Sequence, residues 1–323
     1  MYNFASMKIF FLLAMVTLFP TTGSAQINSF HWEKIDHSPF IIHYLEGDHY
    51  SAGLVKNRLD FAYPRLQDEF QYQLTQPVYL YLCNSFDSYR QVVGKNVPLW
   101  SAGLAYPNRN LIILKTVASE NNYLNTAVHE LTHIITHKMT KGNKLPRWLD
   151  EGLAVYFSNE KEFASSSLIS KALISNSIIP LSDIDHVLSF NPAQAQLAYQ
   201  ESYVAVIYLH KKYGKNSVRA ILNRIGQGDS IDKAFIHSIG MDSWDFELLW
   251  YNYIQKKYKW HFLVDFEFYL WIFILLLFIF GFILIRYRNK KKIREWEEED
   301  YLYDDYWGDF DSDPDFSSDD DYN

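Results

Sequence analysis

The chain has 323 residues, of which 48% are hydrophobic, so it is long and apolar enough to bury a sizeable core. Its single cysteine, Cys83, excludes a fold held together by internal disulfides. The net charge of −8 comes from one end: 14 of the 38 acidic residues lie from Glu295 onward, which leaves 24 acidic against 30 basic residues before it. Six of those basic residues lie within 286–294, so the part of the chain before them is near neutral and is not expected to bind nucleic acid.

The first 25 residues have the features of a secretory signal peptide. Lys8 precedes a short apolar run, 9–19, and small residues follow at positions 23 and 25. We therefore expect cleavage after Ala25. The alternative is an uncleaved membrane anchor, but the run is shorter than the ~20 residues that a spanning helix needs. Residues 26–267 would then form a domain outside the cytoplasmic membrane.

Strands and helices alternate in the first part of this domain. After a short polar start, runs rich in β-branched and aromatic residues predict strands, and a longer run with helical apolar spacing predicts a helix that Pro64 could kink or split. A second, short helix would be capped by Ser85. The predicted elements are strands at 39–45 and 77–82, helices at 52–70 and 85–92, and a hairpin at 104–114 with its turn at 107–110.

The segment His-Glu-Leu-Thr-His, residues 129–133, has the spacing of a metal site on a helix. Residues four apart lie on one helix face, so His129 and His133 can direct two imidazole nitrogens at a single ion. Glu130 could then take a proton from a water bound to that ion, which is the chemistry of a zinc hydrolase. The alternative is an ordinary helix with these side chains on its solvated side.

A catalytic zinc ion needs a third protein ligand, and Glu151 is the candidate. It lies on a second apolar stretch, 148–157, which follows the turn-rich residues 140–144 and Pro146. A helix, a turn and a returning helix would bring Glu151 beside His133. The predicted ligands of one Zn²⁺ ion are therefore His129, His133 and Glu151.

Together, the motif at 129–133 and Trp-Leu-Asp-Glu-Gly at 148–152 resemble the gluzincin clan of zinc metallopeptidases. In that clan, two histidines and a downstream glutamate bind zinc. The chain from about 40 to 258 is similar to small peptidase MA-like domains. This resemblance implies hydrolysis of a peptide or protein substrate. The GAMEN motif of the aminopeptidase branch is absent, and Ser-Ala-Gly-Leu-Ala stands in its place at 101–105, so an aminopeptidase is not implied.

The resemblance also implies roles for residues around the zinc site. The edge strand near 103–106 would pair with an extended peptide, and a tyrosine from the helical half would stabilise the oxyanion. Tyr199 is the first candidate and Tyr203 the second, although the chain has 24 tyrosines and either could be a packing residue. Asp150 could orient a zinc-bound histidine or be an early-turn acid of the second helix. His137 fits a surface or supporting histidine better than a fourth ligand.

Beyond Glu151 the pattern is helical. Helical apolar spacing extends over 164–175, 182–188, 193–213, 217–225, 231–236 and 243–258, with glycines at 214, 226 and 240 between segments. The predicted fold class is α+β: a small mixed β-sheet with the zinc-binding helix, followed by an α-helical half and one transmembrane helix.

Residues 268–285 carry no charge and are long enough to cross a bilayer. Six basic residues follow within 286–294, which predicts that this side is cytoplasmic. The chain would thus contact membrane lipid through one helix, with the domain outside and residues 286–323 inside. The acidic tail from Glu295 is interpreted as solvated and disordered, or as the docking site of a cytoplasmic partner.

The leading hypothesis is a membrane-anchored zinc peptidase that hydrolyses peptide bonds outside the cytoplasmic membrane. The alternative is a zinc-stabilised binding or sensory ectodomain coupled through the membrane helix to the acidic tail. Glu130 favours the peptidase, because a binding scaffold gains nothing from a general base.

Overall fold

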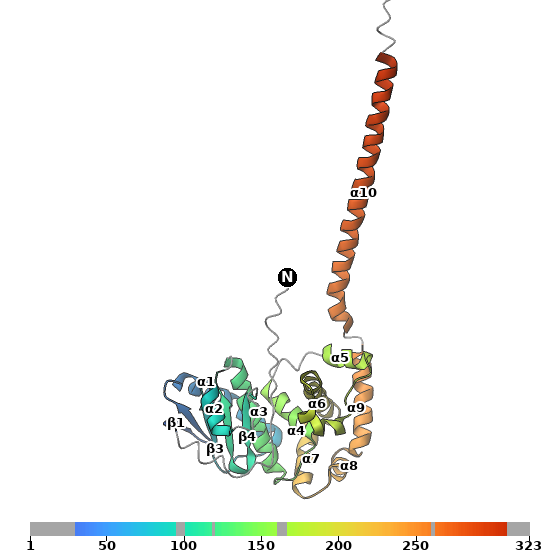
Figure 1. The fold of residues 1–323 in the computed structure, drawn as a ribbon. Coiled ribbons are helices and arrows are strands. Elements are labelled where there is room, and N and C mark those ends of the chain that lie inside the picture. Colours follow the sequence, from blue (N-terminus) through green and yellow to red (C-terminus); the bar gives the residue numbers. More distant parts are fainter. Residues whose placement is uncertain (1–29, 95–100, 118–119, 160–166, 260–261, 309–323) are drawn as a thin grey trace, which may run out of the picture. The chain divides into compact units, whose positions relative to one another are not determined.

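The computed structural model describes residues 30–94, 101–117, 120–159, 167–259 and 262–308 (Figure 1). The chain divides into two compact units, one up to Phe262 and one from Leu263 onward. The predicted signal peptide, 1–25, lies outside the described residues.

Within the described residues, the strands of the first unit form one five-stranded sheet in the order β1-β2-β3-β5-β4. Strands β2, β3 and β5 are parallel, and β1 and β4 pair antiparallel at the two edges. The predicted mixed sheet is therefore confirmed. The strands are β1 (Trp32–His37), β2 (Phe40–Leu45), β3 (Val78–Cys83), β4 (Gly103–Tyr106) and β5 (Leu111–Lys115).

Strand β1 was not predicted, because its sequence reads as a polar start. The strand is an edge strand, and most of its side chains are exposed or half-buried, so charged residues such as Glu33 and Lys34 are tolerated there. The register Trp32 opposite Leu45 sets it beside β2. Backbone pairing, rather than an apolar pattern, makes it a strand.

One face of the sheet is the core face. Along β2 and β3 every second side chain is buried, as expected for strands with one face turned inward. Helices α1 (His49–Phe70) and α3 (Glu120–Met139) pack on the sheet. Helix α1 runs through Pro64 as a single helix, so of the two possibilities, a kink or a split, the split does not occur. A shorter helix, α2 (Phe86–Val93), packs against β3 and β5 and contributes to a smaller apolar cluster.

The second half of this unit is helical, as predicted. It contains α4 (Arg147–Ser158), α5 (Ser167–Ile174), η4 (Leu181–Ser189), α6 (Pro192–Tyr213), α7 (Lys215–Gly226), α8 (Ile231–Ile239) and α9 (Ser243–Tyr258). The segment expected as an α-helix at 182–188 is the 3₁₀-helix η4. Glycines 214 and 240 cap α6 and α8 as expected. Gly226 ends α7 and also permits close packing, since a Cβ there would lie 2.3 Å from the Met139 carbonyl oxygen.

Helix α3 connects the two halves, because it packs on β4 and β5 on one side and on α4 on the other (Figure 1). Helix α4 in turn packs closely on α6. At Gly152 a Cβ would lie only 2.4 Å from the carbonyl oxygen of Ser202. A side chain at position 152 would therefore hold the two helices apart.

The second unit contains α10 (Phe262–Gly308). Within the described residues, one segment, Tyr269–Trp296, is long and apolar enough to cross a membrane, with a mean hydropathy of 2.5. It includes the whole span predicted from the sequence except its first residue. The helix continues through the basic residues 286–294 to Gly308, and residues 309–323 lie outside the described part.

Candidate metal centre

The two histidines and the glutamate of the first motif lie on α3 and are buried. No glycine or proline interrupts α3, and Leu131 and Ile135 are fully buried in the main core. The exposed fractions of His129, Glu130 and His133 are 0%, 0% and 1%. These side chains therefore do not lie on a solvated helix face, which removes that alternative. Buried polar groups in this number need partners or a ligand.

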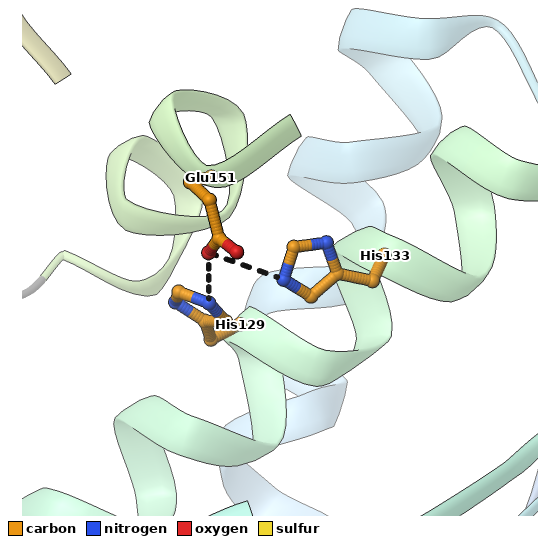
Figure 2. A group of neighbouring side chains, drawn as sticks. All are labelled: His129, His133 and Glu151. Carbon is orange, nitrogen blue, oxygen red and sulfur yellow. Dashed lines mark ion pairs between the residues drawn. The ribbon is translucent and has the colours of Figure 1, made fainter. Parts of the chain in front are cut away.

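Glu151 on α4 is brought to the two histidines (Figure 2). Its Oε2 atom lies 3.4 Å from His129 Nε2 and 3.7 Å from His133 Nε2. The ligand atoms of the three residues all lie within 4.8 Å of one another. The helix–turn–helix arrangement inferred from the spacing thus places the three predicted ligands together.

The distances fit a small metal ion. A tetrahedral zinc ion with bonds of 2.0–2.1 Å keeps its ligand atoms about 3.3 Å apart. The two distances from Glu151 Oε2, 3.4 and 3.7 Å, are close to that separation. His133 Nε2 and Glu151 Oε2 are buried and have no hydrogen-bond partner in the part of the chain that the structure describes. A shared cation would satisfy both atoms.

The outer nitrogen of one histidine is also held. His133 Nδ1 lies 3.0 Å from Asp150 Oδ2, and Thr136 Oγ1 donates to Asp150 Oδ1 at 2.8 Å. A carboxylate on one ring nitrogen orients the other towards a metal. Burial lowers the pKa of His133, but the carboxylates of Asp150 and Glu151 outweigh it and raise the pKa. Asp150 fits both interpretations, because it is an acid in the first turn of α4 and its carboxylate also contacts His133.

Comparison with protein-family models gives an independent finding. Residues 61–256 match the model of the Peptidase MA superfamily. The match covers more than half of the chain, including every residue of the cluster. The chain belongs to the Peptidase MA superfamily. A search of curated proteins found no match. The clan is one of zinc metallopeptidases, so the cluster on α3 and α4 is where a member of the superfamily would hold its metal.

The charges in this peptidase MA domain also suit a divalent ion. Glu130, Asp150 and Glu151 carry three negative charges when ionised. Arg147 supplies one positive charge, with its Nη1 atom 3.4 Å from Glu151 Oε1. Two negative charges are then left in a buried region, and a divalent cation neutralises both. The donor set of two imidazoles and one carboxylate is suited to zinc.

Glu130 is buried beside the two histidines of the cluster. Burial raises the pKa of Glu130 to about 7, and nearby His129 and His133 lower it in part. Strand β4 runs beside Glu130, and the backbone of Ala105 on that strand also lowers this pKa. The strand approaches closely because Gly103 has no side chain: a Cβ there would lie 2.5 Å from Thr126 and 3.3 Å from Glu130 Cγ. A carboxyl group with a pKa near neutral can accept and return a proton.

The other predicted residues lie around the cluster. Tyr199 is buried on α6, one turn before the point at which Ser202 meets Gly152 of α4. Tyr203 is half-buried, and its ring lies 6.4 Å from that of Tyr156. His137 lies one turn beyond His133, with Nε2 2.8 Å from Asn108 Oδ1, so it is a hairpin contact.

Thr136 and Arg147 are residues around the cluster that sequence reasoning missed. The signal for Arg147 is its position four residues before Glu151, which places both on one face of α4. Thr136 gives no such signal, because it contacts Asp150 on a different helix. Its role depends on how α3 and α4 pack.

Proposed function

We propose that the protein is a membrane-anchored, zinc-dependent peptidase that hydrolyses peptide bonds outside the cytoplasmic membrane. The observation that carries the proposal is the buried set of His129, His133 and Glu151 with Glu130 beside it. A site that served only to hold a metal would not need a second, adjacent carboxyl group buried without a metal-ligating role. The superfamily membership supports the same chemistry.

The chain's residues have distinct roles in this reaction. His129, His133 and Glu151 would hold the zinc ion. When bound there, the ion would act as a Lewis acid and lower the pKa of a water molecule towards ~7. Glu130 takes a proton from the attacking water. It then passes that proton to the leaving amine as the peptide C–N bond breaks. The Tyr199 hydroxyl is our candidate donor to the oxyanion that develops on the carbonyl oxygen.

In the described residues β4 is an edge strand of the sheet, and the substrate would add to it as a further strand. The N–H of Lys115 on β5 donates to the carbonyl of Ala102, which makes these two residues a hydrogen-bonded pair. Because such pairs alternate along an antiparallel ladder, the backbone groups of Gly103 and Ala105 point away from β5. An extended peptide paired with them would run beside Glu130. The missing side chain at Gly103 keeps the strand close to that base.

The membrane arrangement is part of the proposal. The segment Tyr269–Trp296 would cross the bilayer as a helix. The basic residues at 286–294 favour a cytoplasmic location for themselves and for the acidic tail. The predicted signal peptide at 1–25 agrees with export of the domain. Protease protection of the domain, but not of the tail, in intact cells with a sealed membrane would contradict this topology.

Metal content and cleavage test the proposal in one experiment. Full-length protein in detergent is prepared as wild type, Glu130→Gln and the control Glu201→Gln. Glu201 is a fully buried carboxyl group on α6 outside the proposed ligand set, and burial raises its pKa, so glutamine of similar shape makes the same chemical change as Glu130→Gln at a different buried site. Zinc is measured by mass spectrometry, and cleavage with a quenched peptide library with and without a chelator.

We expect one zinc per chain in all three proteins. Chelator-sensitive cleavage is expected in wild type and the control, and at least about 100-fold less in Glu130→Gln, the lower range for loss of a general base. Zinc in all three without cleavage in any would favour the binding or sensory ectodomain. The absence of zinc from the wild type would refute the metal centre.

A further inference from the structure

The two oxygens of Glu151 have different partners. Oε2 faces the histidines, at 3.4 Å from His129 Nε2 and 3.7 Å from His133 Nε2 (Figure 2). Oε1 lies 3.4 Å from Nη1 of Arg147. Oε2 thus contacts both histidines, and Oε1 contacts a guanidinium group.

We propose that Arg147 is a positioning residue that holds Glu151 to coordination through one oxygen. The inference rests on the metal centre proposed above. A carboxylate that turned to offer both oxygens would fill a coordination position that a catalytic zinc site leaves open. By holding Oε1, Arg147 keeps the carboxylate from turning.

Arg147 is itself fixed in place. It is the first residue of α4, and its backbone N–H donates to Asp185 Oδ1 at 2.8 Å. The other oxygen of Asp185, on η4, accepts from Lys144 Nζ at 2.8 Å. The Arg147 side chain is only 13% exposed, and it lies on the same helix face as Glu151. An arginine whose backbone is anchored and whose guanidinium group is largely buried can orient a carboxylate.

Burial raises the pKa of Asp185, but the hydrogen bonds from Lys144 and from the Arg147 N–H outweigh burial. The pKa of Asp185 is therefore lowered overall. The carboxylate therefore stays ionised and continues to accept the hydrogen bond from the first residue of α4. A chain of contacts thus runs from η4 to the metal centre. It passes from Asp185 through Arg147 to the proposed zinc ligand Glu151.

Positioning and simple charge have opposite effects on metal affinity. As a mere positive charge, Arg147 repels a cation, so its removal would tighten zinc binding. As a positioning residue, it keeps a ligand oriented, and loss of such outer partners typically weakens metal binding by ~10–100-fold. Lysine separates the two roles, because it keeps the charge and loses the planar fork.

The test compares Arg147→Gln and Arg147→Lys with wild type in full-length protein in detergent. Arg224→Gln is the matched control, because Arg224 pairs with Asp229 at 3.9 Å on the surface of α7. Zinc affinity is measured by competition with a chromogenic chelator. We expect both Arg147 variants to bind zinc about 10–100-fold more weakly, and the control to match wild type.

The coordination number of the zinc ion gives a second readout, by X-ray absorption on the loaded proteins. We expect it to rise from wild type to both Arg147 variants as Glu151 turns to offer its second oxygen. Circular dichroism of the metal-free proteins shows whether each variant is folded. If Arg147→Gln does not fold, the zinc affinity of Arg147→Lys and the coordination number of zinc in wild type still test the proposed role of Arg147.

Three outcomes would overturn the inference. These are tighter binding in Arg147→Gln with wild-type binding in Arg147→Lys, an unchanged coordination number, or a wild-type spectrum in which Glu151 contributes two oxygens. Each of them leaves the proposed metal centre standing, because wild type still binds zinc. A wild-type protein without affinity for zinc would instead refute the metal centre, and the inference with it.

Discussion

Replacing Gly152 with alanine tests whether the close packing of α4 on α6 supports the metal centre. A Cβ at this position would lie 2.4 Å from the Ser202 carbonyl oxygen and 2.8 Å from Val206 Cγ2. An ordinary contact begins near 3.4 Å, so α4 must move by about 1 Å, because a backbone carbonyl cannot turn aside as a side chain can. Overpacking of this kind lowers the free energy of unfolding by about 3 kcal/mol at the upper end. The higher helix propensity of alanine raises it by about 1 kcal/mol.

We therefore expect Gly152→Ala to lower the free energy of unfolding by about 2 kcal/mol. It should also weaken zinc binding, because metal sites tolerate shifts of only ~0.2 Å and the substitution lies directly after Glu151. Urea unfolding of the metal-free protein gives the first quantity, and chelator competition gives the second.

Gly53→Ala is the matched control. Gly53 lies on α1, and a Cβ there would meet nothing within 4 Å. This variant should be more stable than wild type by up to about 1 kcal/mol and should bind zinc normally. If Gly152→Ala were as stable as Gly53→Ala and bound zinc as wild type does, the packing argument would be wrong.

Three further predictions concern other buried groups. Asp150→Asn should weaken zinc binding by about 10–100-fold, because His133 loses its charged partner; a chelator competition that gives wild-type affinity would contradict this role. Burial raises the pKa of Cys83 to about 12, so iodoacetamide should label it at pH 8 only as the protein unfolds, and rapid labelling of native protein would count against the buried thiol. Burial also raises the pKa of Glu201 well above 4.5, so the unfolded chain releases this proton first as pH rises. Stability should then fall above pH ~4.5, by at most roughly 1.4 kcal/mol per pH unit, and urea titrations should show a smaller fall in Glu201→Gln.

The sequence by itself determined the elements whose signals are local. The spacing of His129 and His133 places two ligands on one helix face wherever that helix lies. Ser85 caps α2 as predicted, because a capping hydrogen bond involves residues only three apart. The apolar runs of β2, β3 and β5, and the spacing of α6, α7 and α9, report burial directly. The pairing of Glu151 with the histidines required one further inference, a tight turn between α3 and α4.

The tertiary structure alone decided the contacts between elements. Sequence left Asp150 with two interpretations, and only the packing of α4 on α3 sets it against His133. The strand β1 exists because backbone pairing with β2 outweighs its polar composition. Gly152 gives no local signal, since its importance comes from a carbonyl fifty residues later in the chain. Contacts of this kind depend on distances across helix interfaces, and a one-dimensional pattern carries no information about them.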